Sequence, residues 1–169
     1  GDLDPQSYLL GLRERTQEYA GFNLLVGDGD SLWYLTNSLA HQACVPQCLE
    51  PGLYGLSNAR LDTPWPKVVL GKRRLRALLE NNEIDHEDLA RVVGDRQLAD
   101  LEDLRRQGLG NDMDQVLSAQ FITAGSYGTR SSTTLWSDRQ GVVRWRESSF
   151  DESGKLAGHC EESFRLSEH

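Results

Sequence analysis

The stretch YGTRSSTTLW, residues Tyr127 to Trp136, predicts a turn that leads directly into a β-strand. Gly128 provides a flexible corner, and residues 131–136 are rich in the β-branched and aromatic types that strands favour. Arg130 lies among hydroxyl side chains at the start of this strand, and its guanidinium is a rigid fork of donors suited to a carboxylate or a phosphate. The stretch alone leaves two interpretations open: a ligand-binding arginine, or a surface arginine on an edge strand.

The residues that follow this strand predict an antiparallel meander. A polar turn at 137–141 leads into a strand over 142–150. A second polar turn at 151–155 leads to a final strand over 159–166. Alternation in the VRWR run at 143–146 places one face of the meander in the core and the other toward solvent or a covering helix.

The residues before it predict helices between short strands. Asp4 and Pro5 begin a helix over 5–20, and Asp85 begins one that ends at Gly94. The other predicted elements are strands over 22–26, 32–36 and 52–56, a helix after Pro66, and a short helix or a bend over 113–121. The fold class predicted from this order is α+β.

Composition restricts the classes of partner. The 169 residues suit one domain, 1–169, and the net charge of -8 argues against a nucleic-acid partner. The basic run Lys72 to Arg76 is interpreted as a solvated helix face. No apolar run approaches the roughly 18 residues that a membrane span needs, and the first residues lack the hydrophobic region of a signal peptide. A cytoplasmic location is therefore expected, while the oligomeric state is left open.

No resident metal is expected. Asp28 and Asp30 form a hairpin tip that lacks the bidentate glutamate and the loop length of a calcium site. Cys44 and Cys48 are four residues apart without a second metal-binding pair, and Cys160 is isolated. The three cysteines are interpreted as incidental thiols of a reducing compartment.

Three segments, in this order and spacing, resemble the NRDE family, also called the transport and Golgi organisation protein family. They are YAGFNLLVGD at 19–28, LYGLSN at 53–58 with LDTPWPK at 61–67, and YGTRSS at 127–132. The resemblance extends over about residues 19–150. Several uncommon strings agree, so the likeness is more specific than one short motif.

The resemblance implies an Ntn-hydrolase-like fold, a four-layer αββα sandwich of antiparallel sheets. Family members carry a cysteine after the initiator methionine and the Asn-Arg-Asp-Glu string that names them, and this sequence has neither. In the superfamily the residue at the mature N-terminus attacks an amide and its own amine serves as base. We therefore expect 1–169 to correspond to the C-terminal two-thirds of one NRDE-type domain, without the nucleophile, and whether the family activity is enzymatic stays open.

The resemblance also implies two catalytic-type positions. Asn58 is the counterpart of an oxyanion-hole donor, and Arg130 of an arginine that orients the nucleophile or holds a carboxylate. A helix cap or a turn former is the alternative interpretation for Asn58. Arg60, Lys67, Tyr127 and Thr129 are predicted to contact the ligand.

For function, the resemblance implies trafficking of haem or of a lipid-like acyl compound, a small hydrophobic anion that cationic side chains would hold. No cofactor is required, and haem would be the transported ligand. Its contact would have no fixed axial ligand from this chain, because all four histidines lie outside the matching segments. The alternative is a cysteine-nucleophile amidohydrolase whose N-terminal cysteine is absent from this sequence.

Overall fold

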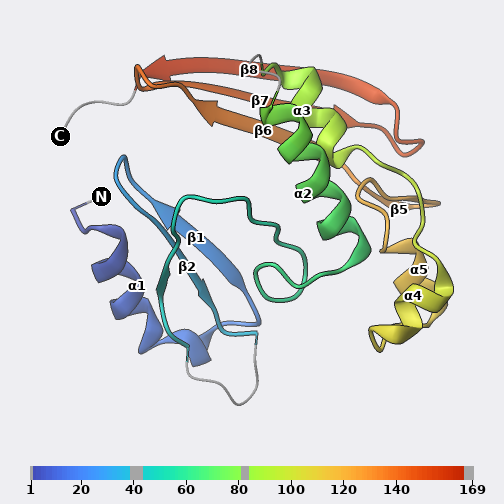
Figure 1. Ribbon diagram of the computed structural model, residues 1–169, viewed down its shortest axis with the longest axis horizontal. Coiled ribbons are helices and arrows are strands. Elements are labelled where there is room, and N and C mark those ends of the chain that lie inside the picture. Colours follow the sequence, from blue (N-terminus) through green and yellow to red (C-terminus); the bar gives the residue numbers. More distant parts are fainter. Residues whose placement is uncertain (1, 39–43, 81–83, 166–169) are drawn as a thin grey trace. The chain divides into compact units, whose positions relative to one another are not determined.

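The computed structural model describes residues 2–38, 44–80 and 84–165 (Figure 1). The chain divides into two compact units, Gly1–Thr63 and Pro64–His169. Sheet β1–β2–β3 belongs to the first unit, and sheets β4–β5 and β6–β7–β8 belong to the second. That residues 1–169 form a single NRDE-type domain stays a prediction.

The first unit begins with helix α1, Pro5–Arg13. The Asp4 carboxylate caps it as predicted, accepting a hydrogen bond from the Ser7 amide at 2.9 Å. The helix is shorter than the predicted 5–20, because the Thr16 hydroxyl donates to the Arg13 carbonyl at 3.1 Å. That bond favours a separate 3₁₀ turn over Thr16–Glu18.

An antiparallel sheet follows α1 in the first unit. It consists of β1 (Asn23–Gly27), β2 (Leu32–Thr36) and β3 (Gln47–Cys48), with β2 in the middle. Asp28 is a turn former as predicted, since its carboxylate accepts the amides of Asp30 and Ser31. Helix α1 packs on β2, and the buried hydrophobic side chains of this unit include Leu9, Tyr34, Leu35 and Leu49.

The predicted strand over 52–56 is wrong. This segment is a loop, and both backbone groups of Gly55 are bonded to one residue. The Gly55 amide donates to the Asp62 carboxylate, and the Asp62 amide donates to the Gly55 carbonyl, each at 2.8 Å. Gly55 therefore has neither group left for a strand partner.

Four helices lie in the described part of the second unit: α2 (Pro66–Leu79), α3 (His86–Val93), α4 (Leu101–Arg106) and α5 (Asp112–Val116). Helix α2 begins at Pro66, and α3 is capped by Asp85 and followed by Gly94, all as predicted. The Asp100 carboxylate caps helix α4 by accepting a hydrogen bond from the Glu102 amide at 2.7 Å.

The meander is confirmed as an antiparallel sheet in the order β6 (Ser131–Ser137), β7 (Val142–Phe150) and β8 (Leu156–Arg165). The last strand begins three residues earlier than predicted. A small hairpin, β4 (Thr123–Ala124) with β5 (Tyr127–Gly128), precedes the sheet. Helices α2 and α3 pack together and α3 contacts β6 (Figure 1). The described residues therefore form an α+β arrangement with antiparallel sheets, as expected.

Candidate functional site

The residues predicted for a shared site fall in both units. Asn58 and Arg60 lie in the exposed loop between β3 and α2, in the first unit. Lys67, Tyr127, Thr129 and Arg130 lie in the second unit. The convergence of Asn58 and Arg130 on one hollow therefore stays a prediction.

The YGTR segment is held by its hairpin. The Thr129 amide donates to the Ile122 carbonyl at 2.9 Å, and the Thr129 hydroxyl accepts the Ile122 amide at 3.0 Å. The hydroxyl of Thr129 thus helps to close the hairpin, while the side chain of Tyr127 is exposed.

Arg130 is exposed beside the turn between β7 and β8. The pKa of Asp151 in this turn is lowered, first by the hydrogen bond from the Lys155 amide, and the positive charge of Arg130 is a smaller cause. Arg130 is therefore a surface cation, in accord with the surface interpretation, and its contact with a ligand stays a prediction.

Of the predicted contacts, Lys67 lines a hollow of the second unit. It lies in the first turn of α2, where its ammonium donates to the Leu117 carbonyl at 2.7 Å. The same ammonium is 5.6 Å from the centre of the Trp65 ring. Burial lowers the pKa of Lys67 because the charged form loses hydration.

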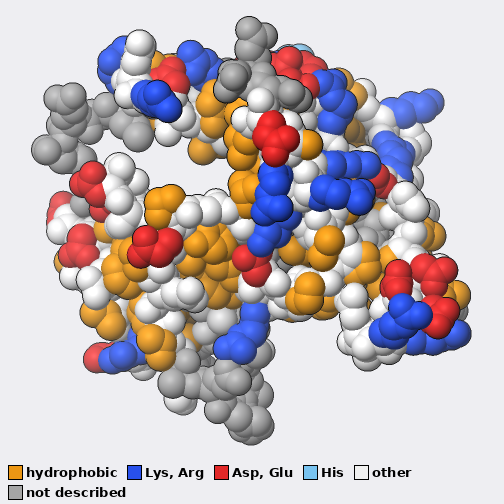
Figure 2. All heavy atoms as spheres, viewed as in Figure 1, with side chains coloured by type: hydrophobic (Ala, Val, Ile, Leu, Met, Phe, Trp, Pro, Cys, Tyr) orange, Lys and Arg blue, Asp and Glu red, His pale blue; other side chains and the backbone are white. Residues whose placement is uncertain are grey.

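One hollow of the second unit lies between α2 and α3, is largely open to solvent and has a volume of about 870 Å³. We call it the α2–α3 cavity. Its apolar wall comes from Ala77, Leu78, Ala90 and Val92. Its charged lining consists of Arg74, Arg91 and Arg96 together with Asp88 and Asp95. Lys and Arg side chains gather over the part of the view that α2 occupies, with apolar side chains next to them (Figure 2). An apolar wall with cations at its edge suits a ligand that has an apolar body and anionic groups.

Each arginine of the cavity already has at least one protein partner. Arg74 forms an ion pair with Asp95, and Arg91 forms one with Asp88. Arg96 donates to the Gly154 carbonyl at 2.6 Å, and its guanidinium carbon is 4.3 Å from the centre of the Phe121 ring. A guanidinium carries five N–H donors, so these contacts orient the groups and still leave donors for an anion.

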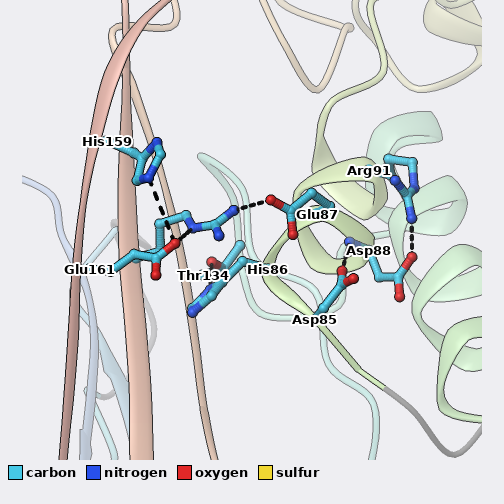
Figure 3. A network of polar contacts seen from close by, with 9 residues as sticks. Asp85, His86, Glu87, Asp88, Arg91, Thr134, His159 and Glu161 are labelled. Carbon is cyan, nitrogen blue, oxygen red and sulfur yellow. Dashed lines mark hydrogen bonds and ion pairs between the residues drawn. The ribbon is translucent and has the colours of Figure 1, made fainter.

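A polar network joins α3 to the sheet next to the cavity (Figure 3). Arg146 of β7 pairs with Glu87 of α3 at 2.5 Å and with Glu161 of β8. His86 shares a 2.7 Å hydrogen bond with the hydroxyl of Thr134, which is buried on β6. Because α3 supplies one wall of the cavity, this network holds that wall on the sheet.

Asp95, which lies between Arg74 and the Gln97 amide, makes the stability of the site depend on pH. Its pKa is lowered, chiefly by the hydrogen bond from the Gln97 amide and then by Arg74, while burial acts in the opposite direction. A carboxyl group whose folded-state pKa is lowered stabilises the fold above its unfolded-state pKa, near 3.8. This contribution is lost as the pH falls through the folded-state pKa.

We therefore expect Asp95→Asn to be less stable than the wild type at pH 7, with the difference narrowing toward pH 2. Urea unfolding monitored by circular dichroism between pH 7 and pH 2 measures this difference. Asp30→Asn, in the exposed β1–β2 turn, is the matched control. A gap between wild type and Asp95→Asn that stays constant with pH would contradict the assignment.

Sequence reasoning missed the three cavity arginines. Arg74 was part of the basic run interpreted as a solvated face, and Arg91 was only part of a predicted helix. A signal did exist, since Arg74, Ala77 and Leu78 recur at helical spacing on one stripe of α2. No group of three or more His, Cys, Asp or Glu side chains in the described part of the chain is placed to hold a metal.

Comparisons with known proteins support the resemblance. The sequence pattern of the family described as "Transport and Golgi organisation 2" matches residues 1–152. The chain is 32% identical over 161 residues to the transport and Golgi organization 2 homolog of Mus musculus, and 31% identical over 161 residues to that of Homo sapiens. Each match covers 88% of this chain and 57% of the relative, so the chain spans little more than half the length of these proteins. Within the described residues, no helix is long and apolar enough to cross a membrane. The match of the family pattern, together with these identities, shows that the chain belongs to the transport and Golgi organisation 2 family.

Proposed function

We propose that this chain binds haem or a lipid-like acyl compound in the α2–α3 cavity, as part of a protein that carries such ligands in the cytoplasm. The observation that carries the proposal is an apolar wall with three arginines in one hollow, where the cations outnumber the two carboxylates, Asp88 and Asp95. The relatives are named for transport and Golgi organisation, and a carrier accords with those names.

The chemistry of the cavity fits the anionic groups of such ligands. Haem propionates, acyl carboxylates and the phosphates of an acyl-CoA are all acceptors for guanidinium groups. Ala77, Leu78 and Val92 would contact the apolar body of the ligand. A volume of about 870 Å³ lies within the range of small-molecule sites.

We also propose that the complete protein has the fold that the family resemblance implies. The α+β arrangement with antiparallel sheets agrees with an Ntn-hydrolase-like αββα sandwich, which we propose for the complete protein. That Asn58, Arg60 and Arg130 contact a ligand stays a prediction from the family resemblance. Haem would bind transiently, without a fixed axial ligand from this chain.

Spectroscopic titration tests the proposal. Haem added to the protein is expected to show a saturable shift of the Soret band, and palmitoyl-CoA is expected to compete with it. Arg91→Gln should weaken binding about two- to tenfold, because it removes one cation from the rim of the cavity.

The matched control is Arg106→Gln on α4. Arg91 and Arg106 are similarly exposed, at 70% and 67%, and each pairs with an aspartate three residues earlier in its helix. Only Arg91 lines the cavity, so Arg106→Gln should bind as the wild type does. No saturable shift and no competition by palmitoyl-CoA, or an equal loss in both variants, would refute this function.

A further inference from the structure

A second, smaller hollow lies at the N-terminal end of α2 and has a volume of about 310 Å³. We call it the α2–α4 hollow. Residues that line it include Lys67, Leu70 and Arg73 of α2, Asp100 and Asp103 at the start of α4, and Gln120. Of its lining, only Asp95 is shared with the α2–α3 cavity.

The side-chain amide of Gln120 has an acceptor atom without a partner. Its nitrogen Nε2 donates to the Lys67 backbone carbonyl at 3.0 Å, which determines which end of the amide is the nitrogen. The carbonyl oxygen Oε1 is buried and accepts no hydrogen bond in the described part of the chain. Burying an acceptor unpaired costs about 1–3 kcal/mol, and a ligand donor that reached Oε1 would remove this cost.

Helix α2 is built to admit this amide. Gly71 lies in the interior of the helix, where glycine is about 1 kcal/mol less favourable than alanine. A Cβ atom added at Gly71 would lie only 2.7 Å from Gln120 Nε2. The glycine therefore allows the amide to lie directly against the helix.

Lys67 supplies a charged donor to the same hollow. Its ammonium makes one hydrogen bond, to the Leu117 carbonyl, and forms no ion pair with a carboxylate of the described residues. An ammonium has three N–H donors, so two are left. Its part-buried position means that an anionic ligand group would gain more from it than from a fully hydrated lysine.

Carboxylates of α4 supply the opposite charge. Asp100 caps α4 and Asp103 pairs with Arg106, and both line the hollow. A ligand with an ammonium or a hydroxyl donor is therefore favoured over a ligand with anionic groups alone.

We propose that the α2–α4 hollow binds a small amino or hydroxy carboxylate. Its carboxylate would accept hydrogen bonds from Lys67, and its amino or hydroxyl group would donate to Gln120 Oε1. This site is independent of the haem or acyl site, because it requires a different set of contacts and a much smaller ligand.

Titration of ¹⁵N-labelled protein with simple probes, followed by NMR, tests this site. L-serine and L-lactate carry both groups, whereas propionate lacks the donor and ethanolamine lacks the carboxylate. At least one of the first two should shift the side-chain amide signals of Gln120 saturably. Propionate and ethanolamine should bind at least about tenfold more weakly.

Two variants separate the contacts. Lys67→Met should weaken binding of the responding probe about tenfold or more. If Lys67→Met does not fold, Gln120→Met takes its place in the test, and it should also weaken binding. Lys155→Met, which removes an ammonium from the exposed β7–β8 turn, should leave it unchanged. The site is overturned if neither L-serine nor L-lactate gives a saturable shift at Gln120, if propionate binds equally well, or if Lys67→Met binds as the wild type does.

Discussion

Leu35→Ala is expected to lower the free energy of unfolding by about 2–5 kcal/mol. Leu35 lies in the central strand of the first unit and has no exposed surface. The substitution removes buried methyl groups and leaves a cavity next to a strand that α1 covers, and surrounding side chains fill such a cavity only in part. Denaturant unfolding monitored by circular dichroism measures the loss.

Leu32→Ala is the control for this prediction. Leu32 is in the same strand, but its side chain is 42% exposed, so the same chemical change removes less buried surface. We expect a loss below about 1 kcal/mol for Leu32→Ala. Equal losses for the two variants would show that Leu35 is not a core residue of this unit.

Gly154→Ala is expected to destabilise the second unit by about 1–3 kcal/mol and to weaken ligand binding in the α2–α3 cavity. Gly154 lies in the β7–β8 turn with a φ of 71°, a conformation that alanine adopts only with strain. The added Cβ would also lie 3.0 Å from Thr123 Oγ1 and 3.2 Å from Arg96 Nη1. Relief of this crowding moves Arg96, which is one of the three cavity cations.

Gly141→Ala separates backbone strain from crowding. Gly141 has a similar φ of 74°, in the β6–β7 turn, but an added Cβ there would meet no atom within 4 Å. Its loss of stability should be smaller, and its haem affinity should equal that of the wild type. Unfolding and Soret titrations on both variants measure the two effects. If Gly154→Ala bound haem as Gly141→Ala does, the role of Arg96 in the cavity would be refuted.

Sequence reasoning located the elements that depend on local signals. The cap at Asp4, the cap at Asp85 and the stop at Gly94 were all predicted, because a helix end is decided by side chains within one turn of it. The strands β2 and β7 were predicted with their observed bounds, since turn residues flank both.

Sequence reasoning failed where side chains of nearby residues compete for backbone groups. The segment 52–56 has a strand-like composition, but Asp62 takes both backbone groups of Gly55. The helix over 5–20 ends early because the Thr16 hydroxyl bonds to the Arg13 carbonyl. Neither the composition nor the periodicity of the sequence indicates the bonds of Asp62 to Gly55 or of Thr16 to Arg13.

By itself, the sequence determined the α+β class, the meander and the family, because helix caps, alternation and uncommon strings are properties of short segments. The tertiary structure decided the two hollows and their chemistry. Arg96 reaches Gly154 across 58 residues, and Lys67 reaches Leu117 across 50. Such contacts form only after the chain has folded, since packing brings groups far apart in the sequence within hydrogen-bonding distance.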